Sequence, residues 1–219
     1  MNTITNFLWD LVFPFGNFLE TVDNRPKPIA LLDLVLHILP LTFFVYWIFS
    51  FIPYGALAYM IVFTFIAALK HIKSKSITNK SEKINIILWY YVVLICGFGT
   101  LRNFIGHFFL SDSVAQSIGW ATGSQFQIEL AFYHLGVSLA ALTSIWLRKN
   151  LIVGLAIIEI VFGFGAAYVH IKDIILSNNF APANTGSVLL GDILIPLIFI
   201  FLLVLTKREF SNKKNKLII

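Results

Sequence analysis

Long apolar runs separated by short polar segments dominate the chain and predict six membrane-spanning helices. The runs cover residues 29–50, 54–69, 84–105, 126–147, 151–171 and 187–205. Most of them approach or exceed the roughly 18 consecutive apolar residues that mark a spanning helix. Pro40 predicts a kink inside the first run, and Pro53 predicts a turn before the second. The pattern therefore predicts an all-α membrane protein with a six-helix bundle over residues 29–206.

Two further segments flank this bundle. Residues 1–28 place apolar side chains at helical spacing, include Asp10 and Glu20, and end in a basic, proline-containing connector. These features predict an amphipathic helix at the membrane interface, because a secretory signal would begin with basic residues. Residues 207–219, after the bundle, form a basic tail. Inside the bundle, a short helix is also expected near residues 112–118, between the third and fourth spans.

Composition and charge agree with a membrane location. Hydrophobic residues make up 58% of the chain and charged residues 12%, against about 25% charged in soluble domains. The net charge of +5 comes from basic residues between the apolar runs and in the tail, which indicates membrane topology and contact with lipid headgroups, not nucleic-acid binding. Trp89, Trp120 and Trp146 lie near span ends, as interface anchors do, and are assigned no chemistry.

The distribution of basic residues also predicts an orientation. With six spans and a cytoplasmic N-terminus, only Arg102 and Lys172 of the 16 Lys and Arg fall outside the cytoplasm. Basic residues hold loops on the cytoplasmic side, so both termini are predicted to be cytoplasmic. An odd number of spans would instead distribute the basic clusters over both faces.

Four features of the second half recur in the same order: a Gly-Phe-Gly triplet, a histidine, a Thr-Gly-Ser triplet and a carboxylate. The first copy comprises Gly97-Phe98-Gly99, His107, Thr122-Gly123-Ser124 and Glu129. The second comprises Gly163-Phe164-Gly165, His170, Thr185-Gly186-Ser187 and Asp192. They predict a parallel duplication of a two-helix hairpin, residues 84–147 and 151–206, with chance matching of small residues as the alternative. Glycines in apolar helices are expected to permit close helix packing, not nucleotide binding.

Polar side chains inside or beside the apolar runs predict a pocket in the outer half of the bundle. Such groups are costly at membrane depth and are usually buried and functional. Ser124 and Gln127 have the spacing of a capping box at the start of the fourth span. Pro196 cannot donate to the carbonyl of Asp192, which leaves an oxygen atom for a cation or a donor. The predicted pocket residues are His107, Gln127, Glu129, His134, Glu159, His170, Asn184 and Asp192.

Three functions are compatible with this pocket. The first is binding and translocation of a small solute, an ion or a proton, with Glu159 continuing the path inward. The second is a membrane-embedded enzyme or redox protein. The third is an accessory or assembly subunit whose polar loops bind a protein partner or a second copy. Enzymatic activity is thus one hypothesis among three.

A metal ion or a haem is the cofactor that the enzyme hypothesis requires. His107, Glu129, His170 and Asp192 would form a mixed imidazole and carboxylate site suited to zinc or iron. A haem needs two histidines on facing helices, which His134 and His170 would supply. In the structural alternative, each histidine bonds a group on a neighbouring helix and only stabilises the bundle.

Residues 106–142 resemble an uncharacterised family of bacterial multi-pass membrane proteins, a domain of unknown function. The motif residues are Gly106-His107, Asp112, Val114-Ala115, Ile118-Gly119-Trp120, Gly123, Phe126-Gln127 and Glu129, followed later by His170, Asn184 and Gly186. The family usually has Asn where this chain has His134. The resemblance covers residues 97–206 and implies a six-helix protein of the bacterial inner membrane, with no known activity.

Overall fold

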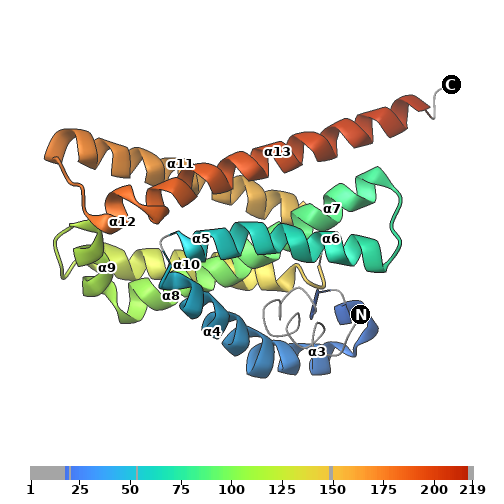
Figure 1. The fold of residues 1–219 in the computed structure, drawn as a ribbon, viewed down its shortest axis with the longest axis horizontal. Helices are drawn as coiled ribbons and strands as arrows, with labels where there is room; N and C mark the ends of the chain where they lie inside the picture. Colours follow the sequence, from blue (N-terminus) through green and yellow to red (C-terminus); the bar gives the residue numbers. More distant parts are fainter. Residues whose placement is uncertain (1–17, 20, 53, 148–149, 217–219) are drawn as a thin grey trace. The chain divides into compact units, whose positions relative to one another are not determined.

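The computed structural model describes residues 18–19, 21–52, 54–147 and 150–216, and every element within them is helical (Figure 1). Among these residues, five helical stretches are long and apolar enough to cross a membrane: Lys27–Ser50, Gly55–Ser74, Lys80–Phe109, Leu151–Ser177 and Pro182–Thr206. The all-α membrane class is therefore confirmed. Most of the predicted interfacial helix lies outside the described residues, and so do Arg148 and Lys149.

The chain divides into two compact units, Met1–Leu94 and Ile95–Ile219. In the first unit, π-helical turns interrupt otherwise continuous helices. Pro40 lies just after one of these turns, at the position where its missing N–H removes a helical hydrogen bond. The elements, in order, are η1 (Val22–Asn24), α3 (Lys27–Asp33), η2 (Leu34–Ile38), α4 (Leu39–Ser50), α5 (Gly55–Ala58), η3 (Tyr59–Phe63), α6 (Thr64–Ser74) and α7 (Lys80–Tyr91).

Helices α6 and α7 pack against each other within the first unit. The Asn79 side chain caps α7 by accepting hydrogen bonds from the backbone N–H groups of Ser81 (3.0 Å) and Glu82 (3.3 Å). The segment between the apolar runs 54–69 and 84–105 is therefore partly helical, because both helices extend into it. A hydrogen bond of 2.8 Å between His71 Nδ1 and the Tyr90 hydroxyl joins the two helices.

A π-helical segment, η4 (Val92–Gly99), continues α7 into α8 (Thr100–Phe109). In the second unit, α8 packs against α10 (Gln125–Thr143), and α11 (Asn150–Ser177) runs beside α13 (Ser187–Lys216) (Figure 1). Each pair is joined through a short helix, α9 (Ser111–Ile118) or α12 (Pro182–Thr185), and these two short helices contact each other.

The first glycine of each Gly-Phe-Gly triplet lies at a close helix contact, as the sequence predicted. A Cβ atom on Gly97 would lie 3.1 Å from a methyl group of Leu142, and the Ser138 hydroxyl donates to the Gly97 carbonyl at 2.8 Å. A Cβ atom on Gly163 would lie 2.5 Å from Cγ of Pro196. Gly165 has no such neighbour within 4 Å.

Several predicted spans have different ends in the structure. Helix α13 continues to Lys216, although the apolar pattern ended at residue 205. The span predicted over 126–147 forms α10, which has 19 residues and ends at Thr143. At 1.5 Å per residue α10 is about 29 Å long, close to the thickness of the hydrocarbon core. It is not among the five apolar stretches because several polar residues interrupt it.

Candidate functional site

The structure separates the predicted pocket residues into two groups, both in the second unit. His107, Gln127 and His134 lie on the α8–α10 pair. Glu159, His170, Asn184 and Asp192 lie on α11, α12 and α13. Glu129 belongs to neither group. Its side chain is exposed, and it lies two residues after the buried Gln127, which places it about 200° around the helix.

The α8–α10 group is a stacked pair of histidines. The His107 and His134 rings lie 5.5 Å apart with an interplanar angle of 19°. His107 Nδ1 is 2.6 Å from Oε1 of Gln127, which accepts the hydrogen bond. The predicted capping box is therefore wrong: Gln127 is used by His107, and the Ser124 side chain makes no capping hydrogen bond. His134 is only 2% exposed, and in the part of the chain that the structure describes its Nδ1 atom has no hydrogen-bond partner.

The α11–α13 group contains two carboxylates and a histidine. His170 Nε2 lies 3.7 Å from Oδ2 of Asp192, within ion-pair distance but too far for a hydrogen bond. Glu159 is 8% exposed and lies three helical turns from His170 on the same face of α11. It interacts electrostatically with Asp192. Glu159 Oε1 and Asp192 Oδ2 are buried atoms, and neither has a hydrogen-bond partner within the described residues.

A closed network of side chains covers one side of His170. Its ring stacks on Trp120 at 5.8 Å and 15°, and its Nδ1 atom is 2.6 Å from Oδ1 of Asn184. Asn184 Nδ2 donates to the Asn179 carbonyl at 2.7 Å, and Asn179 Nδ2 donates to Asp173 at 2.6 Å. The Trp120 indole N–H donates to the same Asp173 oxygen at 2.9 Å, which closes the ring of contacts.

Sequence reasoning missed three members of this network. Trp120 is a motif residue but was interpreted as an interface anchor and assigned no chemistry, and neither Asp173 nor Asn179 was a candidate. Asp173 is a charged residue at the end of a long apolar run, and this feature of the sequence would have identified it as a candidate. Asn179 also explains Gly119, one of the residues on which the sequence resemblance depends. Gly119 has φ +81°, and a Cβ atom there would lie 2.5 Å from Oδ1 of Asn179.

The geometry gives no support to the metal-centre hypothesis. In the described part of the chain, no group of three or more His, Cys, Asp and Glu side chains is arranged to hold a metal ion. His107 and His170 belong to different helix pairs, and Glu129 is exposed. The two histidines of the haem hypothesis are packed against protein rings, His134 on His107 and His170 on Trp120.

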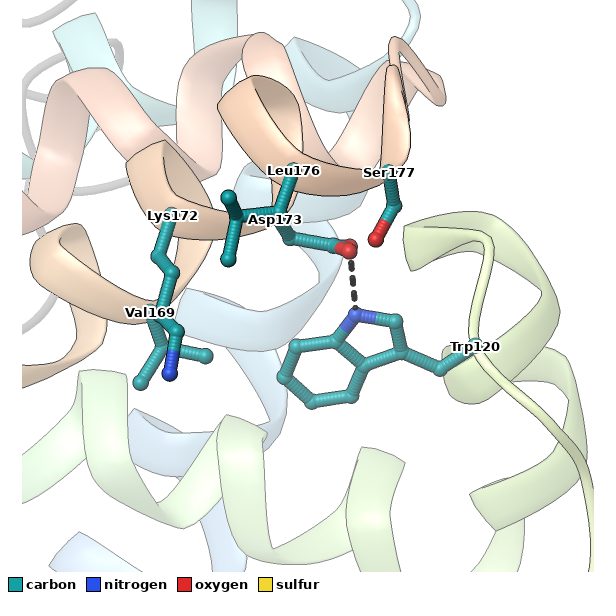
Figure 2. Close-up of a pocket in the computed structure, with 6 residues that line it drawn as sticks. All are labelled: Trp120, Val169, Lys172, Asp173, Leu176 and Ser177. Atoms are coloured by element: carbon teal, nitrogen blue, oxygen red, sulfur yellow. Dashed lines mark hydrogen bonds between the residues drawn. The ribbon is translucent and has the colours of Figure 1, made fainter.

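An open groove of about 240 Å³ lies beside the network (Figure 2). Trp120 and Asp173 line it from the network side, and the hydrogen bond between them crosses its edge. The remaining lining residues are Val169, Lys172, Leu176 and Ser177, all from the last turns of α11. The groove is small compared with the roughly 300–1,000 Å³ of pockets that enclose drug-sized molecules.

The membrane-length apolar helices and the polar residues buried among them define a multi-pass helical membrane protein. The chain belongs to a family of unknown function (DUF6790), whose model matches residues 54–212. The sequence resemblance pointed to an uncharacterised family over residues 97–206, and the match extends further toward the N-terminus. Neither the curated proteins nor the solved structures contain a match to this chain.

Proposed function

We propose that this protein binds a proton or a small cation between α11 and α13 and carries it through the membrane. His170, Asp192 and Glu159 would be the binding groups, in that order along the path. The observation that supports this function best is a pair of carboxylates, the buried Glu159 and the half-buried Asp192, each with a buried oxygen atom that has no hydrogen-bond partner among the described residues.

A carboxylate oxygen that is buried without a hydrogen-bond partner is costly to maintain as part of a bare anion in an apolar bundle. Glu159 and Asp192 also interact electrostatically, and two such groups cannot both be ionised at low cost. A shared proton, or a cation between the two side chains, removes this cost. Two neighbouring carboxylates that hold a proton or a cation in this way can also transfer it from one to the other.

The backbone around Asp192 supplies a further oxygen atom for the same purpose. Pro196 has no N–H, so it leaves the carbonyl of Asp192 without its usual helical donor. Gly163 faces this carbonyl: a Cβ atom there would lie 3.1 Å from it. The small residue on α11 thus keeps the carbonyl uncovered by a side chain, next to the carboxylate.

The proposal includes six spans, with α10 as the fourth, and both termini in the cytoplasm of a bacterial inner membrane. It also includes the hairpin duplication. The α8–α10 and α11–α13 pairs each contain a short connecting helix, and in each pair a histidine Nδ1 bonds an amide oxygen at 2.6 Å. This correspondence supports a common origin of the two hairpins.

Reconstituted vesicles test the proposed function. We expect wild-type protein to move protons, reported by an internal pH-sensitive dye, or Na⁺ or K⁺, reported by an ion-selective dye. Glu159→Gln and Asp192→Asn should each lower the flux at least about tenfold, since each removes a binding charge from the path. Both replacements keep the shape of the side chain.

Glu129→Gln is the matched control, because Glu129 is an exposed carboxylate on α10 of the same unit. Flux through this variant should equal that of the parent. The proposal fails if neither protons nor cations move through the wild-type protein, or if Glu159→Gln and Asp192→Asn conduct as well as Glu129→Gln.

A further inference from the structure

The groove at the end of α11 carries two opposite charges that are not paired with each other. In the view of Figure 2, the Lys172 ammonium lies beside Val169, and the Asp173 carboxylate lies at the other end, near Ser177. The indole ring of Trp120 extends from the carboxylate toward Lys172. Within the described residues, neither Lys172 nor Asp173 has an ion-pair partner.

The position of the groove points to a lipid as its occupant. It lies in the last turns of the candidate span Leu151–Ser177, and the ends of spanning helices lie at the level of lipid headgroups. Exposed side chains with apolar surface continue from the groove toward the middle of the span along α11: Val169 is 44% exposed, Tyr168 is 65% exposed and Val161 is 69% exposed. A headgroup in the groove would place acyl chains along this apolar surface.

We propose that the groove binds phosphatidylethanolamine. Its phosphate would pair with Lys172, and its primary ammonium would donate to Asp173 and contact the face of the Trp120 indole. Asp173 already accepts hydrogen bonds from Trp120, Asn179 and Ser177, but a carboxylate has about four acceptor positions, so one remains for an ammonium.

Charge complementarity selects this headgroup over the other common ones. An anionic glycerol headgroup has no cation for Asp173, so that carboxylate would stay unpaired. A choline headgroup carries the positive charge but has no N–H to donate to the carboxylate. The small volume of the groove also favours the compact ethanolamine group over the trimethylated one.

Native mass spectrometry of the delipidated full-length protein in detergent tests this assignment, with the melting temperature as a second readout. We expect phosphatidylethanolamine to bind and stabilise the wild-type protein more than phosphatidylcholine or phosphatidylglycerol. Asp173→Asn should weaken phosphatidylethanolamine binding about tenfold, and Lys172→Ala should weaken binding of all three lipids through the phosphate. Lys75→Ala, an exposed lysine outside the groove, should change nothing.

The lipid comparison on wild-type protein keeps the test valid even if a groove variant fails to fold. Equal binding of the three lipids would overturn the proposal. Soluble phosphoethanolamine that stabilises the protein as strongly as the lipid would also overturn it, because the groove would then be a site for a free zwitterion. Glu159→Gln should bind the lipid normally, so this result is independent of the proposed transport function.

Discussion

His107 and His170 each bond an amide side chain through Nδ1 and stack on a second ring. An amide oxygen can only accept, so the proton of this hydrogen bond is on Nδ1 of each histidine, and Nε2 is the ring atom left for a second partner. In His170 that atom faces Asp192, so the amide of Asn184 fixes which nitrogen is directed toward the carboxylate. At the scale of residues, the amide partners orient the histidines of the proposed path.

Asn184→Ala should therefore affect both stability and flux. Asn184 is fully buried, and its loss leaves His170 Nδ1 and the Asn179 carbonyl without partners. We expect the free energy of unfolding to fall by about 2–4 kcal/mol, from about 1–2 kcal/mol for each unsatisfied group. Denaturant unfolding followed by tryptophan fluorescence measures this change.

Thr185→Ala is the control for that substitution. Its hydroxyl makes one long hydrogen bond, 3.3 Å to the Ala181 carbonyl, so we expect a loss below about 1 kcal/mol. If the two variants were equally stable, the buried amide of Asn184 would not hold the network together.

At the scale of elements, the contact between α11 and α13 depends on one small residue opposite a proline. Gly163 lies against Pro196 and against the carbonyl of Asp192, so the helices approach closely beside the proposed binding groups. Helix packing inside a membrane relies on such small residues, because lipid is as apolar as the helix surface. The same contact therefore positions Asp192 and holds the two helices together.

Gly163→Ala should destabilise this helix pair. The new Cβ atom would lie 2.5 Å from Cγ of Pro196, so the helices must move apart, at a cost of about 1–3 kcal/mol. Gly165→Ala, two residues later, meets no atom within 4 Å and should leave the melting temperature unchanged or slightly higher. Melting curves of the two variants in the same detergent compare them directly. An unchanged Gly163→Ala protein would contradict the close contact.

At the scale of the whole molecule, the number of spans depends on whether α10 crosses the membrane. The predicted six spans include α10, whereas the five apolar stretches do not. Helix α10 is long enough to cross the hydrocarbon core but less apolar than the five candidate stretches. Burial of Gln127 and His134 against neighbouring side chains lowers the cost of placing these residues in a membrane, whereas Glu129 stays on an exposed face.

Cysteine labelling tests the topology. Cys96 is fully buried and should not react with an impermeant maleimide, so single cysteines can be introduced at exposed positions of the otherwise native chain. With six spans and the predicted orientation, Ser124→Cys should be labelled in intact cells, and Lys75→Cys and Leu147→Cys only after the membrane is opened. Labelling of Ser124→Cys and Leu147→Cys from the same side would mean that α10 does not span the membrane.

Local properties of the sequence determined the helical membrane class, the position of most spans and the close packing at Gly97 and Gly163. The length and periodicity of apolar runs carry that information, since each helix satisfies its own backbone hydrogen bonds and needs only an apolar surface to lie in lipid. The sequence also identified His170, Asn184 and Asp192 as polar residues in an apolar setting, which the structure then brings together.

Only the tertiary structure decided which polar residues share a site. Trp120 meets Asp173 across 53 positions of the chain, and Asn179 meets Ile118 across 61, through the packing of short helices that carry little apolar periodicity. Glu129 fits the repeat in sequence, yet the rotation of α10 about its axis turns it outward. Helix rotation and loop packing depend on contacts between distant segments, so the sequence pattern determines the spans while the packed structure determines the site.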